Sequence, residues 1–345
     1  MTTTSGVPTS AWTDPGCFEV APGVHRIPLT MPNDGLRAIN VYAIETPRGL
    51  ALIDGGWRVP SALRELTVAL ATIRYSPADI HDVYVTHIHR DHYTFAVELR
   101  RLFGSRVHLG QHEQPGLHEV MAIRTNVPVG SIRELERAGA PALASDMIDL
   151  TAAEPFDDEA WELPDSWLDA GTIDLGGRQL EVVPTPGHTK GHVVFQDRVN
   201  GLLFTGDHVL PTITPSIGFE LGARELPLQH YLASLRLLLT RPDGRLMPAH
   251  GFPTDSVHER VEQLLGHHAE RFEQAERVLG SLGTPATAHE VARRLLWTRR
   301  ERRLAELDPF NQMMAVCETL AHLDVMVEDG RVHATSTPVA MFSAR

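Results

Sequence analysis

A short cluster of histidines places the strongest constraint on how this chain can fold. Residues 86–92 read Thr-His-Ile-His-Arg-Asp-His and follow the apolar triplet Val83-Tyr84-Val85. Much later in the chain, His188, Asp207 and His250 each come after another short apolar run. Imidazole and carboxylate groups are ligands that zinc takes from proteins. The pattern therefore predicts a site that gathers these side chains and can hold two metal ions.

The settings of the later residues strengthen this interpretation, because 19 histidines in 345 residues will sometimes cluster by accident. His188 lies in a Pro-Thr-Pro-Gly-His run after Val182 and Val183, where proline and glycine favour a turn that leaves a strand. Asp207 follows residues 202–206 and His250 follows residues 246–249 in the same layout. Each expected ligand thus ends a predicted strand.

These motifs resemble those of the metallo-β-lactamase-fold superfamily of metal-dependent hydrolases, over about residues 20–255. The resemblance implies one metal on His87, His89 and His188, a second on Asp91, His92 and His250, and Asp207 between them. It also implies that Asp54, in the turn at residues 52–56, supports the ligands from behind, as ligating histidines usually require.

The family resemblance implies an α/β fold, the αββα metallo-β-lactamase sandwich. Strands are expected at residues 24–29, 40–44, 50–54, 83–85 and 106–109, and helices at 60–73 and 91–103. We expect an N-terminal extension at 1–19 and a catalytic domain at 20–254. Within it, the loosely patterned segment 111–170 is expected to form a cap over the active site.

Residues 255–345 are predicted to form a helical, winged-helix-like C-terminal domain. The pattern indicates a helix at 255–279, a linker at 280–283, a helix from a capping box at Thr287 to Trp297, and a helix at 309–323. A hairpin around Asp329-Gly330 is expected over residues 325–333. This order resembles the winged helix appended to some members, including a lactamase-like branch known for RNA cleavage.

The charge distribution argues against nucleic acid as a partner. The chain has a net charge of −13, and residues 255–345 hold 11 arginines against 14 acidic residues, a net charge of −3. Binding to a phosphate backbone normally requires a basic footprint. The run at residues 299–303 is the one basic patch, interpreted as a solvated helix face. A role in shaping the substrate entrance or a homodimer contact is expected instead.

Composition predicts a bacterial enzyme of the cytoplasm. No run of about 18 apolar residues suggests a membrane span, and the first residues lack the basic and apolar regions of a secretory signal. The two cysteines, Cys17 and Cys317, make a disulfide framework improbable. Among 31 basic residues only Lys190 is a lysine, a bias typical of a GC-rich bacterial genome.

The chemistry expected of the family is hydrolysis by a metal-bound hydroxide. Two zinc ions, with iron or manganese as alternatives, would lower the pKa of a shared water and polarise a carbonyl group. Asp91 and Asp207 are the expected catalytic residues, which align the nucleophile. A small ester, thioester or lactone is the predicted substrate.

Residues 185–192 are similar to the corresponding segment of glyoxalase II thioesterases. The resemblance implies that His192 supports His188, and Lys190 is a candidate for attracting an anionic group. Tyr93 is a candidate donor to an oxyanion, and His208 should border the cleft. Ile88 stands where glyoxalase II typically has a third histidine, so glutathione thioesters are not assigned.

Four alternatives remain open at this stage. A phosphodiesterase or ribonuclease would show salt-dependent binding to RNA, and iron-dependent oxidation of a sulfur compound would show colour and an electron paramagnetic resonance signal. A regulatory protein using the winged helix on DNA is disfavoured by the acidic charge of that domain. β-Lactam hydrolysis is disfavoured by the lack of a secretory signal.

Overall fold

The inner strands of the first sheet bury both of their faces. In β4 (Gly49–Ile53), Leu50 and Leu52 belong to the core beneath the helices, whereas Ala51 and Ile53 belong to the core between the two sheets. Successive side chains of a strand point to opposite faces. Strands with near-continuous apolar sequences are therefore what a sheet covered on both sides requires.

The computed structural model describes residues 11–32, 35–217, 226–335 and 338–345. A seven-stranded sheet runs in the order β1-β2-β3-β4-β5-β6-β7, and a five-stranded sheet runs in the order β12-β11-β10-β9-β8. Besides β4, the first sheet contains β1 (Phe18–Ala21), β2 (Val24–Thr30), β3 (Ala38–Thr46), β5 (Ile80–Val85), β6 (Arg106–Gly110) and β7 (Ser166–Leu168). The second contains β8 (Gly171–Asp174), β9 (Gln179–Pro184), β10 (Val193–Asp197), β11 (Leu202–Gly206) and β12 (Arg245–Pro248).

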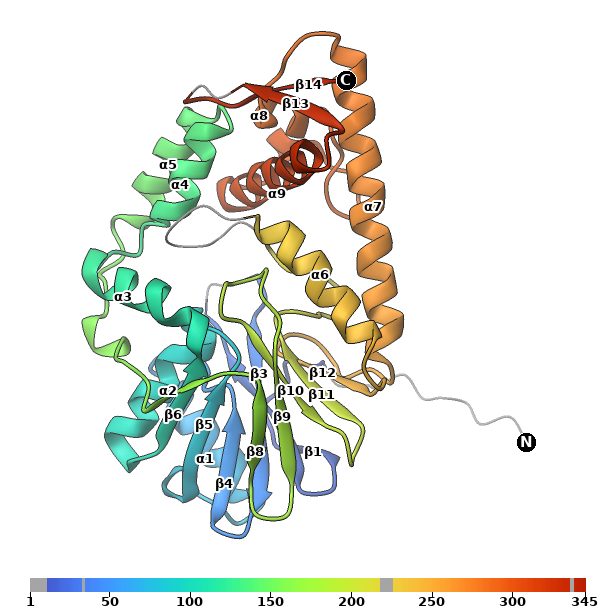
Figure 1. Ribbon diagram of the computed structural model, residues 1–345. Coiled ribbons are helices and arrows are strands. Elements are labelled where there is room, and N and C mark those ends of the chain that lie inside the picture. Colours follow the sequence, from blue (N-terminus) through green and yellow to red (C-terminus); the bar gives the residue numbers. More distant parts are fainter. Residues whose placement is uncertain (1–10, 33–34, 218–225, 336–337) are drawn as a thin grey trace.

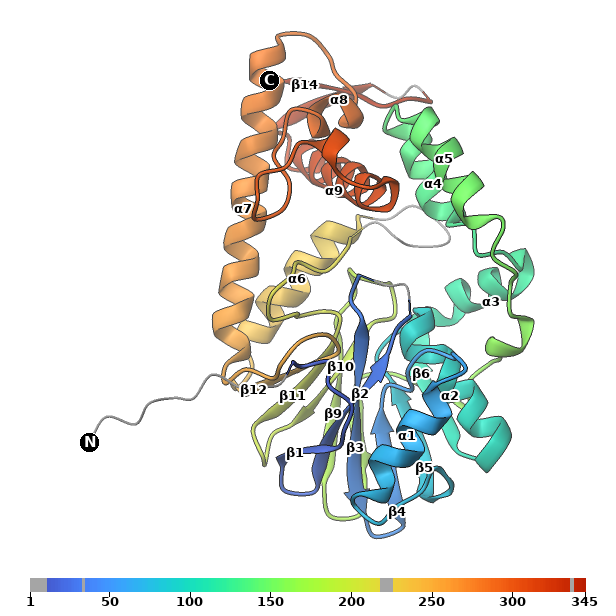
Figure 2. The ribbon, with the colours of Figure 1, turned by 180° about the vertical axis from the view of Figure 1, so that it is seen from behind.

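Helices cover the outer face of each sheet, as Figures 1 and 2 show from opposite sides. α1 (Ala62–Ala71) and α2 (Arg90–Phe103) pack on the seven-stranded sheet. α6 (Pro227–Leu239) and the first half of α7 (Val257–Leu282) pack on the five-stranded sheet. The predicted αββα sandwich is confirmed, and the predicted strands and helices up to residue 109 match the observed ones within a few residues.

A further hydrophobic core lies beyond the sandwich and joins two distant parts of the chain. α4 (Val129–Arg137) and α5 (Pro141–Thr151) share it with the end of α7, with α8 (Ala288–Ala292), α9 (Pro309–Glu328) and β14 (Met341–Ala344). The Arg137 guanidinium pairs with the Asp324 carboxylate across this contact. The C-terminal segment therefore packs with part of the insert at 111–170, a contact that the sequence did not reveal.

The remaining elements are short connections around these layers. α3 (Gln114–Ile123) leads into α4, and β13 (Val332–Thr335) pairs with β14 as an antiparallel hairpin. Single turns of 3₁₀ helix occur at Pro77–Asp79, Gln111–Glu113, Asp158–Ala160 and Leu304–Glu306.

The expected hairpin around Asp329-Gly330 is wrong. α9 continues through Val325, which packs in the core over the five-stranded sheet, and Met326, which packs in the helical core, and it ends at Glu328. Gly330 has a φ of 68°, and the Arg331 N–H donates to the Met326 carbonyl, which closes the helix in a Schellman motif. The Asp-Gly pair is therefore a helix terminator, and the hairpin follows it as β13 and β14.

Three smaller expectations about this region also need correction. The proposed linker at 280–283 is the last turn of α7, and only Gly283, with a φ of 65°, leaves it. The capping box at Thr287 is present, but α8 ends at Ala292, well before Trp297. The basic run at 299–303 forms a turn with positive φ at Thr298 and Glu301, so it is no helix face.

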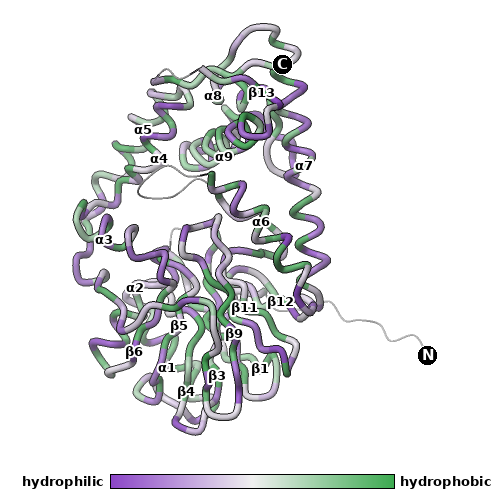
Figure 3. The backbone as a smooth tube through the Cα atoms, viewed as in Figure 1, coloured by the Kyte–Doolittle hydropathy of each residue, from purple (hydrophilic) through white to green (hydrophobic). Residues whose placement is uncertain are grey.

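α7 connects the sandwich to the helical core along one side of the molecule (Figure 1). Its 26 residues alternate between hydrophilic and hydrophobic stretches (Figure 3), which lets one face contact both cores while the other faces solvent. Among the residues that the structure describes, no helix is long and apolar enough to cross a membrane.

Candidate metal centre

The seven predicted ligands come together where strands of both sheets end. β5 ends at Val85, and the next residues carry His87 and His89 into the start of α2, whose first turn carries Asp91 and His92. His188 lies in the turn after β9, Asp207 follows β11 directly, and His250 follows β12. Five elements thus contribute to one buried cluster.

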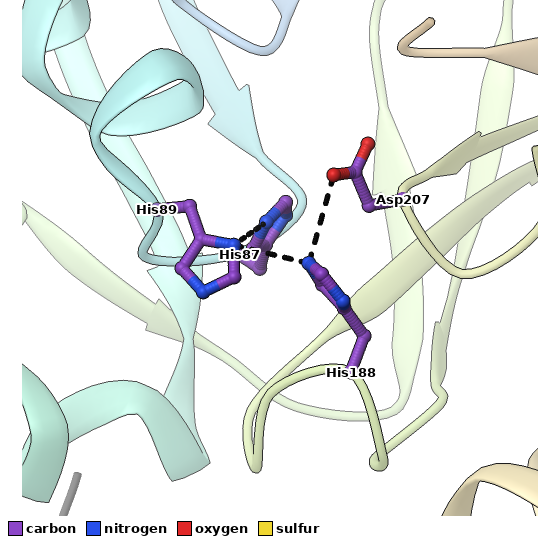
Figure 4. Close-up of side chains that lie close together, drawn as sticks. All are labelled: His87, His89, His188 and Asp207. Atoms are coloured by element: carbon purple, nitrogen blue, oxygen red, sulfur yellow. Dashed lines mark hydrogen bonds and ion pairs between the residues drawn. The ribbon is translucent and has the colours of Figure 1, made fainter. Parts of the chain in front are cut away.

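The first ligand group consists of His87, His89, His188 and Asp207 (Figure 4). The Nδ1 atom of His89 lies 2.9 Å from Nε2 of His87 and 3.0 Å from Nε2 of His188. The Oδ2 atom of Asp207 lies 3.6 Å from Nε2 of His188. All the ligand atoms of this group lie within 4.8 Å of one another.

The second ligand group consists of Asp91, His92 and His250. Oδ2 of Asp91 lies 3.3 Å from Nε2 of His250 and 3.6 Å from Nε2 of His92. The Oδ1 atom of Asp207 lies 3.4 Å from Nε2 of His250 and 3.6 Å from Nε2 of His92. Asp207 therefore presents one oxygen to each group.

Metal binding would satisfy the donor atoms of this cluster better than hydrogen bonds among the side chains do. Nε2 of His92, Nε2 of His250 and Oδ1 of Asp207 are buried without a well-aligned hydrogen bond. Buried polar atoms are nearly always satisfied, so orphaned atoms aimed at one centre require an explanation. Histidine and carboxylate sets of this kind suit zinc and other divalent transition metals.

Burial keeps the first group of imidazoles neutral, as metal ligands must be. It lowers the pKa of His87 and of His188, and it lowers that of His89 to about 3. Burial also opposes the charged form of His92, but the carboxylates of Asp54, Asp91 and Asp207 outweigh it and raise its pKa. The second group thus carries more negative charge around its histidines, which a cation would balance.

Each histidine whose second nitrogen has a polar partner is fixed in orientation by it. Nδ1 of His188 lies 2.8 Å from the Ser216 carbonyl, and Nδ1 of His250 lies 2.8 Å from the Ala38 carbonyl. Nδ1 of His92 lies 3.0 Å from the Asp54 carboxylate. Such contacts set the tautomer and aim Nε2 at the centre.

Asp54 also holds the end of β5 in place. Its Oδ1 accepts hydrogen bonds from the Thr86 N–H, at 2.8 Å, and from the Thr86 hydroxyl, at 2.9 Å. Close packing behind Thr86 needs glycine at position 206, where a Cβ atom would come within 2.5 Å of the Thr86 hydroxyl. Gly206 also has a φ of 50°, so the residue before Asp207 is constrained twice.

The other predicted residues lie close to the centre but have different partners. Nδ1 of His192 lies 3.0 Å from the Thr185 hydroxyl, and its ring stacks on His87 rather than bonding to His188. His208 is fully buried and packs edge-on against Tyr231. Lys190 is half-buried in the turn after His188.

Tyr93 does not point its hydroxyl into the site. The side chain is fully buried, its hydroxyl donates to the Glu162 carbonyl at 2.5 Å, and its ring stacks on Trp161. The hydroxyl has a single proton to donate, so this geometry favours a packing role over the expected oxyanion contact.

Sequence reasoning missed Glu113, which ties together the two loops of the first ligand group. Its buried carboxylate accepts a hydrogen bond from the Ile88 N–H and another from the Thr189 hydroxyl. Burial raises the pKa of Glu113 to about 7. Nothing in the irregular segment around residue 113 signals this contact, and the supporting carbonyls of Ser216 and Ala38 have no sequence signal at all.

Comparison with known proteins agrees with this geometry. The family model of the metallo-beta-lactamase superfamily matches residues 34–250. The probable metallo-hydrolase YqjP of Bacillus subtilis is 27% identical over 289 residues, covering 80% of this chain and 84% of its own. The lactamase-like protein ptaB of Pestalotiopsis fici is 25% identical, covering 85% of this chain and 78% of its own.

Solved structures extend the likeness to nearly the whole chain. The metallo-beta-lactamase family protein TTHA1429 of Thermus thermophilus has a TM-score of 0.74 at 26% identity, covering 95% of this chain and 100% of its own. A beta-lactamase domain protein of Burkholderia ambifaria, at 24% identity and a TM-score of 0.76, shares the fold over 98% of this chain and 96% of its own. The family model spans well over half of the residues, and the chain therefore belongs to the metallo-β-lactamase superfamily, as a metal-dependent hydrolase.

Proposed function

We propose that this protein hydrolyses a small ester, thioester or lactone with two zinc ions bound between its seven ligands. The observation that carries the proposal is the placement of Asp207, whose Oδ2 faces His188 while its Oδ1 faces His92 and His250. A carboxylate in that position is suited to bridge two ions. When bound, such ions lower the pKa of water and polarise a carbonyl oxygen.

The chain's own residues would position the water and the substrate. Asp91 and Asp207 line the space between the two ligand groups, and their carboxylate oxygens can accept a hydrogen bond from the attacking water. This contact would aim the lone pair of the water at the carbonyl carbon. No serine or cysteine nucleophile is needed in this scheme.

The absence of an evident proton donor among the neighbouring histidines supports the substrate class. Burial lowers the pKa of His208 to about 3 and that of His192 well below its usual value. Neither ring is an imidazolium at neutral pH, so neither can act as an effective general acid. Thioesters and lactones have leaving groups that depart without much protonation, so they suit this site better than amides or phosphodiesters.

A cavity next to the metal centre supports a small-molecule substrate. It has a volume of about 1270 Å³ and lies between residues 212–216, α7, the start of α9 and the turn at 294–299. The metal ligands do not line it, but Ser216 does, and its carbonyl is the group that orients His188. Five arginines and three glutamates lie in its wall, which would favour a substrate with an anionic portion.

Hydrolysis assays with a thioester, a lactone and bis-p-nitrophenyl phosphate test the proposal, together with the metal content of protein purified without added metal. We expect about two zinc ions in the centre and turnover of a carbonyl ester that Asp207→Ala abolishes. Asp174→Ala, at an exposed strand end, is the matched control. Near-normal turnover by Asp207→Ala, a preference for the phosphodiester, or iron in place of zinc would overturn the proposal.

A further inference from the structure

A second group of histidines and a carboxylate lies in the helical part of the molecule. His268 is in α7, and Glu318 and His322 lie one turn apart in α9. One potential ligand atom from each of the three lies within 4.8 Å of the others. The two histidines are buried, whereas the Glu318 side chain is 21% exposed and lines the cavity described above.

The histidines of this group have the geometry of the ligands in the catalytic centre. Nε2 of His322 lies 3.1 Å from Nδ1 of His268, close to the 2.9 Å and 3.0 Å that separate facing nitrogens in the first ligand group. Nδ1 of His322 lies 2.7 Å from the Glu318 carbonyl, just as His188 and His250 contact carbonyls at 2.8 Å. That contact makes Nδ1 the protonated nitrogen and aims the lone pair of Nε2 at His268.

Protein contacts alone leave the group incompletely satisfied. Nε2 of His268, the ring nitrogen that does not face His322, is buried without a hydrogen-bond partner. The Glu318 carboxylate makes only long ion pairs, 3.8 Å to Nε2 of His267 and 3.9 Å to Nε of Arg271. Separations of this length are too long for hydrogen bonds. Burial opposes the charge, but the neighbouring His267, His322 and Arg271 lower the pKa of Glu318, so its carboxylate is ionised at neutral pH and could bind a cation.

Arg271 is the nearest positive charge, and other contacts hold its guanidinium. Its Nη1 donates to the Leu296 carbonyl at 3.1 Å, and its guanidinium carbon lies 4.1 Å from the centre of the Trp297 ring. These contacts leave the side of Glu318 that faces His268 and His322 to another cation.

We propose that His268, Glu318 and His322 bind a third metal ion, zinc or a similar divalent transition metal, that links α7 to α9. Two imidazoles and one carboxylate form a ligand set that zinc accepts, with a fourth position left for water or another small ligand. Because Glu318 lines the cavity, that fourth position would open toward it. The ion would fix the helical part against α7 and would take no direct part in the reaction at the sandwich. The proposal does not depend on the proposed function.

The decisive measurement is the zinc content of full-length protein whose catalytic centre cannot bind metal. The fourfold variant His89→Ala/His188→Ala/Asp207→Ala/His250→Ala removes ligands from both groups and provides that background, and we expect it to keep about one zinc ion per chain. Adding His268→Gln and His322→Gln should remove this ion, whereas adding His333→Gln, on the exposed hairpin, should not. A background variant that binds no more zinc than the variant that also lacks His268 and His322 would overturn the proposal.

A spectroscopic measurement distinguishes the loss of a metal ligand from misfolding of the variant. Cobalt(II) added to the background variant should give visible absorption bands typical of histidine ligation, and Glu318→Gln should shift or abolish them while circular dichroism stays unchanged. Zinc should also raise the melting temperature of the background variant and leave that of the variant without His268 and His322 unaffected. Cobalt spectra that are identical with and without Glu318→Gln would count against this carboxylate as a ligand.

Discussion

The two histidine clusters of this molecule are built on different kinds of backbone. The candidate metal centre collects its side chains from strand ends and the turns after them: residues 87–92 supply four of the seven, and His188, Asp207 and His250 each stand on a separate segment. The second cluster takes its residues from two long helices, where Glu318 and His322 share a face because they are four residues apart. Metal-binding residues that follow strands therefore form recognisable sequence motifs. Residues that packed helices bring together show no such motif.

The largest expected effect separates the two clusters by function. Asp207→Ala should lower kcat by roughly 10³-fold, because the loss of several kcal/mol of charge stabilisation corresponds to such a factor. His322→Gln should leave kcat nearly unchanged, since its cluster lies outside the reacting centre. Steady-state kinetics on both variants check this, and a comparable loss from His322→Gln would erase the functional distinction.

The next effect concerns the support behind the ligands. Asp54→Asn keeps the size of the side chain but removes the charge that faces His92 and Thr86. We expect metal affinity or activity to fall by about 10–100-fold, as for other groups that orient metal ligands. Competition with a zinc chelator measures the affinity, with Asp169→Asn, at an exposed position, as the control. Equal affinities for the two variants would show that Asp54 does not orient the site.

Asp54 could be predicted from the sequence, whereas other groups that orient the histidines could not. The proposed ligands and Asp54 could be named from the sequence because they match the motifs of the family, and their positions could be expected because those motifs follow apolar runs that form buried strands. The fold of the sandwich was predictable for the same reason. The partners of His188 and His250 are backbone carbonyls, which any residue supplies, so no sequence signal exists for them.

In the C-terminal region, local sequence patterns were not sufficient to predict the structure. Asp329-Gly330 suits a hairpin turn and a helix end equally well, and tertiary packing decided between them: Val325 packs in the core over the five-stranded sheet and Met326 in the helical core. The contact between α4, α5 and α9 joins residues nearly 190 positions apart, as in the Arg137–Asp324 pair. Local patterns carry no information about such pairings.

A third effect is on stability and follows from the raised pKa of Glu113, about 7 in the folded protein against an ordinary value of 4.5. The folded state favours the protonated acid, so the stability from Glu113 is full below pH 4.5 and is lost as pH rises to about 7. The loss should be about 3 kcal/mol. The Glu113→Gln variant has no proton to release at this position, so it should not show this loss of stability.

Denaturant unfolding of the wild-type protein and Glu113→Gln at several pH values measures this difference. The free energy of unfolding of the wild type should fall relative to that of the variant between pH 4.5 and 7 and stay constant above. A difference that does not change with pH would mean that Glu113 is ionised throughout. The loops that carry the first ligand group would then be joined by a charged carboxylate.

The smallest effect decides the role of Tyr93. If its hydroxyl only donates to the Glu162 carbonyl, Tyr93→Phe removes one buried hydrogen bond and should cost about 1 kcal/mol of stability with kcat unchanged. A donor to an oxyanion would instead account for about 10²–10³-fold in kcat. These outcomes differ so widely that kinetics and one unfolding curve suffice. A large loss of kcat without loss of stability would mean that the Tyr93 ring turns toward the metal centre during turnover. Tyr93 would then belong to the catalytic residues of α2, together with Asp91 and His92.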